Sequence, residues 1–91
     1  MAAVTYTDGK EIIQDTAECM RRIWISPSTM DSADTVIVPT VTGATLRIVS
    51  AYDNTDGDSI TATVSSFTIT LDASGGATDS RYVIEFIYVQ G

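Results

Sequence analysis

The residues best placed to do chemistry lie together at positions 53–58, where three carboxylates and one amide occur close together. Oxygen ligands at this density suit Ca²⁺. An EF-hand loop aligned on Gly57, however, would run from Tyr52 to Thr63 and would lack both its first carboxylate and its closing bidentate glutamate. Asp, Asn and Gly also tolerate the left-handed backbone of tight turns. We therefore interpret residues 53–58 as an acidic turn between two strands, with a cation site as the alternative.

No other group of residues has the composition of a catalytic or cofactor site. The glycine-rich residues 73–78 lack the Lys-Ser/Thr pair of a phosphate loop. The chain has no histidine, so no serine or cysteine has its usual general base. Asp31 and Asp34 could do acid–base work, but a pair of loop aspartates more often confers solubility. Cys19 is the single cysteine, which excludes an internal disulfide and a multi-thiolate metal site. The sequence predicts no catalytic, metal-binding or cofactor-binding residues, and a protein that is not an enzyme.

The charge balance disfavours two classes of partner. Five basic residues against twelve acidic ones give a net charge of −7. Nucleic-acid binding depends on Lys and Arg displacing counterions from phosphate, and anionic membranes attract the same residues. Only Arg21 and Arg22 are adjacent, and they could instead pair with a carboxylate on a partner. We expect neither a nucleic-acid nor a membrane partner.

No targeting or spanning segment is recognised in the sequence. The first six residues lack the basic and apolar regions of a secretory signal. No apolar run approaches the roughly 18 residues that a membrane-spanning helix needs. We expect a protein made in a cytosol, or carried with a larger assembly.

The composition predicts a single all-β domain over residues 1–91. Thr, Ile and Val supply 32 of the 91 residues, whereas leucine occurs only at Leu46 and Leu71. Beta-branched side chains fit a pleated, half-buried surface, and leucine normally dominates helical cores. Short apolar stretches separated by turn signals are typical of a small antiparallel β-sandwich or a small barrel. Strands are predicted at residues 22–26, 35–39, 45–52, 60–64, 67–71 and 81–89.

Four of these strands have an informative pattern. Residues 60–71 alternate apolar and threonine side chains on both sides of Ser65-Ser66, which predicts a hairpin with one apolar and one threonine face. In residues 45–52, Leu46, Ile48 and Tyr52 are expected on one face. The last strand, residues 81–89, is apolar on both faces and interrupted only by Glu85, so it is expected to be buried centrally or between subunits.

The N-terminal part, residues 1–20, admits several readings. From Asp8 the spacing fits a capping box followed by a short helix that carries Ile12 and Ile13. The same residues also fit a hairpin turning at Asp8-Gly9, which would pair residues 4–6 with 12–13. A third reading is an extended arm on a neighbouring subunit.

The aromatic side chains allow a core role or a binding role. Trp24 is most simply a core residue, with an interface anchor as the alternative. Tyr6, Tyr52, Tyr82 and Tyr88 could serve a carbohydrate- or receptor-binding β module, because aromatic faces are natural ligand platforms. Most of these tyrosines fall on apolar strand faces, which favours the core.

The layout of the whole chain carries a family resemblance. Its parts are Val4-Thr5-Tyr6-Thr7, Arg21-Arg22-Ile23-Trp24-Ile25, the strand Ala44 to Tyr52, the hairpin Ser59 to Leu71 and the closing run Tyr82 to Val89. In this layout the chain resembles the small Thr- and Val-rich β proteins that tailed bacteriophages use as capsid decoration, or cement, proteins. The resemblance covers residues 4–89 and rests on size, strand order and composition. Phage tail and fibre modules share the same style and remain an alternative.

The resemblance implies a structural role on a virus particle. It implies a β-sandwich or jelly-roll-like domain that forms a homo-oligomer, commonly a trimer. This oligomer would sit on the outer capsid surface and clamp subunits of the major capsid protein. The last strand and Trp24 are then expected to serve packing and self-association, and residues 2–14 to reach a neighbour. The interface residues implied in this way are Val4, Tyr6, Ile12, Ile13, Trp24, Tyr82, Ile84, Phe86 and Tyr88.

Overall fold

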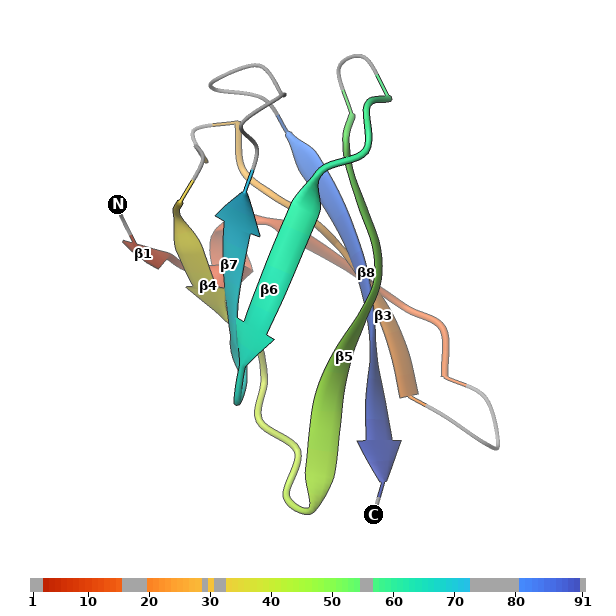
Figure 1. Ribbon diagram of the computed structural model, residues 1–91. Coiled ribbons are helices and arrows are strands. Elements are labelled where there is room, and N and C mark those ends of the chain that lie inside the picture. Colours follow the sequence, from red (N-terminus) through yellow and green to blue (C-terminus); the bar gives the residue numbers. More distant parts are fainter. Residues whose placement is uncertain are drawn as a thin grey trace.

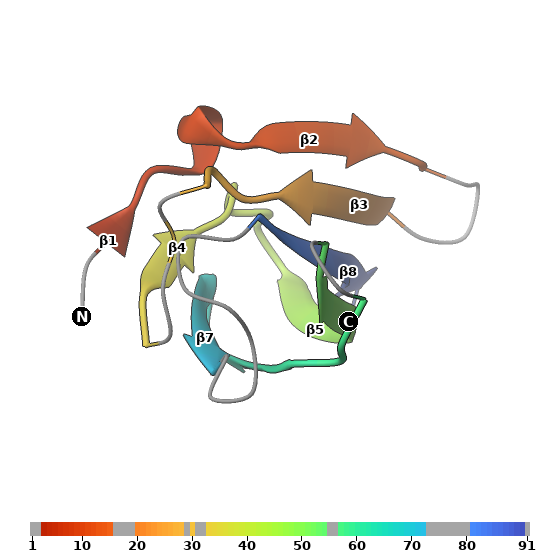
Figure 2. The same ribbon diagram turned by 90° about the horizontal axis from the view of Figure 1, so that it is seen from above.

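The computed structural model describes residues 3–15, 20–28, 30, 33–54, 57–72 and 81–90. These residues form two four-stranded sheets that face each other, which confirms the all-β sandwich (Figures 1 and 2). In the first sheet the strand order is β1 (Ala3–Val4), β4 (Thr35–Ile37), β7 (Thr68–Asp72) and β6 (Thr61–Ser65). In the second sheet the order is β2 (Lys10–Ile13), β3 (Met20–Ile25), β8 (Tyr82–Gln90) and β5 (Ala44–Asp53).

The strand pairing is antiparallel except at one edge. β1 pairs with β4 in parallel, over the two residues Ala3 and Val4. After this short pairing the chain makes a 3₁₀ turn, η1 (Tyr6–Asp8), and crosses to the second sheet to form β2. Figure 2 shows this crossing at one end of the sandwich, where the N-terminal segment joins the two layers. Residues 3–13 therefore link the two sheets of one chain.

The core lies between the sheets and is built from alternating side chains. β8 contributes Tyr82, Ile84, Phe86 and Tyr88, each at most 2% exposed. The remaining buried apolar side chains of the cluster are Trp24, Met30, Val36, Val38, Leu46, Ala51, Ile69 and Leu71. β8 is central in its sheet, between β3 and β5, as its double-sided apolar pattern predicts.

The hairpin of β6 and β7 is confirmed, with its turn displaced by one residue. Val64 pairs with Ile69 and Ala62 with Leu71, so the apolar side chains share one face. Ser65 still belongs to β6, and the two-residue connection is Ser66-Phe67. Ser66, the first central residue of the turn, has a φ of 56°. A type II′ turn requires a positive φ at this position, and its backbone twist matches that of the two antiparallel strands.

A β-bulge changes the predicted faces of β5. The register shifts between Ile48 and Ser50, so Val49 is the extra residue. Leu46 and Ile48 lie on the inner face as expected, but beyond the bulge Ala51 and Asp53 turn inward instead. Tyr52 consequently points outward and is 38% exposed, which corrects the expectation that it shares a face with Leu46.

The N-terminal segment differs from the helix and from the hairpin expected from Asp8 onward. Lys10–Ile13 is the strand β2, and its partner is β3 rather than residues 4–6. No α-helix occurs in the described part of this segment, and residues 16–19 lie outside the described residues. Ala3–Val4 pair with β4 and Lys10–Ile13 with β3 of the same chain, and an arm that lies on a neighbouring subunit stays a prediction. The helical spacing of Ile12 and Ile13 is overridden because pairing with β3 completes a sheet.

Candidate functional site: the outer face of the second sheet

The side chains of β8 that point away from the core define the centre of a second surface. They are Val83, Glu85, Ile87 and Val89, which alternate with the buried side chains of the same strand. The register places β3 and β5 side chains beside them, so that Arg21, Ile87 and Arg47 form one row across the sheet. We call this surface the outer face, and its members are Lys10, Ile12, Arg21, Ile23, Ile25, Thr45, Arg47, Ser50, Tyr52, Val83, Glu85, Ile87 and Val89.

The outer face is apolar where a solvent-facing sheet is usually polar. Ile12 is 44% exposed and Tyr52 is 38% exposed, while Ile23, Ile25 and Ile87 are half-buried among their neighbours. The β1-β4-β7-β6 sheet lies on the opposite side of these strands (Figure 2), and of the apolar members of the outer face Val83 is buried at 7% exposed. Contiguous exposed apolar surface of this kind marks interaction sites.

The charge of the outer face is opposite to that of the whole chain. Three of the five basic residues, Lys10, Arg21 and Arg47, lie on it, against one of the twelve acidic residues, Glu85. Arg21 forms an ion pair with Glu85, whose side chain is 16% exposed. The surface therefore carries an excess of positive charge in a protein of net charge −7. A negatively charged, partly apolar partner would match it.

The second arginine of the predicted pair has a different environment. Arg22 lies on the inner side of β3, pairs with Glu11 and Asp15, and places its guanidinium 5.9 Å from the ring centroid of Tyr88. Its side chain is only 15% exposed. Arg22 therefore joins β2 to the core of its own chain and is not available to a partner carboxylate.

Five of the nine implied interface residues are core residues. Trp24, Tyr82, Ile84, Phe86 and Tyr88 are at most 2% exposed, which meets the expectation of packing. Side chains so deeply buried have no surface to offer a second chain. Val4 and Tyr6 are half-buried, whereas Ile12 and Ile13 are exposed on β2. An interface through these last four residues stays a prediction.

Tyr6 and Trp24 form a stacked pair at the end of the sandwich. Their ring centroids are 5.6 Å apart, and Trp24 Nε1 donates a hydrogen bond of 2.9 Å to the Tyr6 carbonyl oxygen. The Tyr6 hydroxyl donates to Glu11 Oε2 at 2.5 Å. Burial, and then the hydrogen bond to Glu11 and its negative charge, raise the pKa of Tyr6 well above its usual value of 10. These contacts anchor η1 and leave no pair of exposed coplanar rings in the described part of the chain for a sugar platform.

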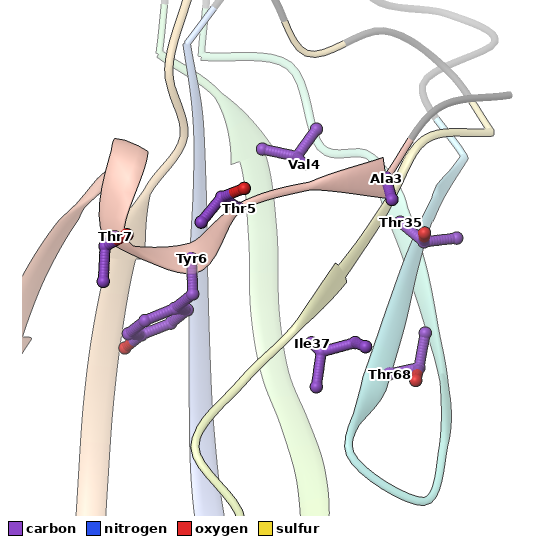
Figure 3. Close-up of a pocket in the computed structure, with 8 residues that line it drawn as sticks. All are labelled: Ala3, Val4, Thr5, Tyr6, Thr7, Thr35, Ile37 and Thr68. Atoms are coloured by element: carbon purple, nitrogen blue, oxygen red, sulfur yellow. The ribbon is translucent and has the colours of Figure 1, made fainter.

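A small apolar pocket lies between η1 and β4. Its volume is about 400 Å³, and Figure 3 shows Tyr6 on one side with Ile37 and Thr68 on the other. The lining residues are Ala3, Val4, Thr5, Tyr6, Thr7, Thr35, Ile37 and Thr68. The pocket contains none of the carboxylates singled out in the sequence.

The acidic stretch at residues 53–58 closes as a turn over its described part. Gly57 N donates to the Asp53 carbonyl oxygen at 2.7 Å, and Asp53 N donates to the Asp58 carbonyl oxygen at 2.9 Å. Gly57 has a φ of +79°, and Asp53 is buried. No three potential metal-ligating side chains lie together among the described residues. Residues 55–56 lie outside them.

The other candidates divide between the core and the undescribed segments. Asp34 is buried beside β4. Asp31, Cys19 and residues 73–78 lie outside the described residues. Within the described part, no helix is long and apolar enough to cross a membrane. Comparison with known proteins finds no matching family model, curated protein or solved structure.

The apolar members of the outer face can be predicted from the sequence, whereas the basic members cannot. The apolar members Val83, Ile87 and Val89 are visible as the second face of the last strand. The basic members come from three other strands, so their row exists only once the strand register is known.

Proposed function

We propose that this protein is a structural, non-catalytic component of a bacteriophage particle. It binds the outer surface of the capsid, bridges subunits of the major capsid protein and stabilises the shell. It uses the outer face of the second sheet for this attachment. The resemblance in chain layout supplies the identity of the partner, and the outer face supplies the means of binding.

The observation that carries the proposal is the exposed apolar surface of the outer face with its arginines. An apolar centre supplies affinity by burial, at roughly 25 cal/mol for each Å² removed from water. Arg47, beside Ile87 in the strand register, fixes the orientation of a carboxylate-bearing partner. Attachment to a repeating lattice multiplies weak contacts of this kind through effective concentration.

The test is co-sedimentation with shells assembled from the major capsid protein encoded beside this protein's gene. Arg47 is exposed, so Arg47→Glu reverses a charge of the outer face without altering the core. We expect this variant to bind the shells at least about tenfold more weakly, equivalent to about 1.4 kcal/mol. Wild-type binding should also weaken as salt rises, because salt screens exposed charge pairs beyond about 10 Å at 0.1 M.

The matched control is the double variant Thr63→Glu/Ser65→Glu. It adds the same amount of negative charge on exposed positions of β6, in the other sheet. We expect it to bind the shells as the wild type does. If the wild type does not sediment with the shells, or if Arg47→Glu and the control bind equally, the proposal is wrong.

A further inference from the structure

The strand β2 is an open edge of the second sheet. It pairs with β3 on one side, and all four of its residues are exposed. Ile12 and Ile13, on opposite faces of the strand, are 44% and 57% exposed. The unpaired N–H and C=O groups of an exposed edge strand are a template for pairing with another strand.

The hydrogen bonds between β2 and β3 show which backbone groups face outward. Gln14 N donates to the Arg21 carbonyl oxygen at 2.9 Å, so Gln14 and Arg21 are a hydrogen-bonded pair of the antiparallel ladder. Such pairs alternate along the strand, which turns the groups of Lys10 and Ile12 toward β3. The N–H and C=O groups of Glu11 and Ile13 therefore point away from the sheet.

The sequence of β2 is complementary to itself in one antiparallel register. With Ile12 opposite Ile12 of a second copy, Glu11 faces Ile13, and these two residues can exchange backbone hydrogen bonds on each side of a two-fold axis. If the pairing were centred on Glu11 instead, Glu11 would lie opposite Glu11 of the second copy. If it were centred on Ile13, Glu11 would lie opposite Asp15 of the second copy. Like charges directly opposite each other are destabilising, so the register centred on Ile12 is selected.

We propose that two copies of this chain pair through β2, antiparallel and centred on Ile12, to make a continuous eight-stranded sheet. The axis is perpendicular to the sheet, so the outer faces of both copies lie on the same side. The isoleucines at position 12 then join the two apolar surfaces into one. This pairing differs from the trimer that the family resemblance implies.

Two of the other three edge strands, β1 and β5, are less suited to such pairing. β1 has only two residues. β5 contains the bulge at Val49, and its end is bridged by the contact between Tyr52 and Ser59. Bulges and short strands are common means of preventing edge pairing.

The inference does not depend on the proposed capsid function, and its experiment uses the isolated protein. Sedimentation velocity over a wide concentration series should show the mass rising from one chain to two. Ile12→Lys places two like charges on the axis, and we expect it to weaken the dimer at least about tenfold. Ile37→Lys, at an exposed isoleucine in the other sheet, should leave the dimer unchanged.

Cysteine cross-linking tests the register itself in a Cys19→Ser background. Directly opposite residues of a non-hydrogen-bonded pair have Cα atoms about 4.5 Å apart, which a disulfide spans. Ile12→Cys should therefore form a disulfide-linked dimer under mild oxidation. Ile13→Cys should not, because each copy's position 13 faces Glu11.

Three outcomes would overturn the pairing. One is a chain that stays monomeric across the whole concentration series. Another is a mass of three chains. The last is cross-linking at position 13, or at an Ile37→Cys control, that is as efficient as at position 12.

Discussion

Gly9 allows the 3₁₀ turn to close over Trp24. A Cβ atom at position 9 would lie 2.4 Å from the Ile25 carbonyl oxygen and 2.6 Å from Trp24 Nε1. The carbonyl belongs to the backbone of β3 and cannot move aside as a flexible side chain could. The same turn carries Tyr6, whose carbonyl oxygen accepts the Trp24 hydrogen bond. The close approach therefore depends on glycine, although its φ of −97° is ordinary.

The substitution Gly9→Ala is expected to destabilise the domain. Forcing a methyl group into packed surroundings costs about 1–3 kcal/mol in the free energy of unfolding. Urea denaturation monitored by the fluorescence of Trp24 measures the effect. Thr7→Ala, at an exposed position of the same turn, is the control and should change the midpoint little. Equal midpoints for the two variants would contradict this account of Gly9.

The stability of the domain is expected to fall above pH 10. The pKa of Tyr6 is raised from 10 in the folded state, chiefly by burial and then by Glu11, and burial also raises the pKa of Tyr88. Between the unfolded and folded pKa values, the folded state holds more protons than the unfolded state. The stabilisation is therefore fully present below pH 10 and is lost as the pH rises further.

Denaturant midpoints measured on both sides of pH 10 test this dependence. Tyr6→Phe removes one of the two titrating hydroxyls, so its midpoint should decline less steeply with pH than that of the wild type. Tyr52→Phe is the control, because Tyr52 lies on the exposed outer face. A Tyr6→Phe variant with the same alkaline decline as the wild type would show that Tyr6 is not the responsible group.

The turn between β6 and β7 holds one residue, Ser66, in a strained backbone conformation that a substitution can relieve. Ser66 adopts a φ of 56°, where non-glycine residues lose roughly 1 kcal/mol. Ser66→Gly is expected to raise the free energy of unfolding by a few tenths to about 1 kcal/mol, since glycine's greater freedom in the unfolded chain offsets part of the gain. Thermal unfolding measures the change. Ser65→Gly, inside β6, should instead lower stability, and a gain from both variants would refute the explanation.

The strands were predictable from alternation, and the departures have local causes. The hairpin and β8 follow directly from their period of two, because each has a core face to fill. The position of β5 was predicted, but the face on which its last side chains lie was not. No residue type in 44–53 signals the bulge at Val49. β2 was missed because its four residues fit a helix as well as a strand, and only β3 decides between them.

The whole molecule presents two unlike outer surfaces. The first sheet directs Thr35, Thr68 and Thr70 away from the core, as the threonine face of the hairpin predicts, with Ile37 as the apolar exception. The second sheet directs isoleucines, valines and basic side chains outward. The apolar half of this difference can be predicted from the last strand alone. The basic half could not be, because Lys10, Arg21 and Arg47 meet only through long-range pairing.

Val49 also bears on how large an assembly can become. Its insertion puts the hydrogen-bonding groups of β5 out of step with those of any straight strand laid beside them. In a dimer joined at β2, the bulged strand β5 would be the edge strand at both ends of the joined sheet. Growth of this second sheet by addition of strands would therefore stop at two chains, which disfavours its extension into a fibril.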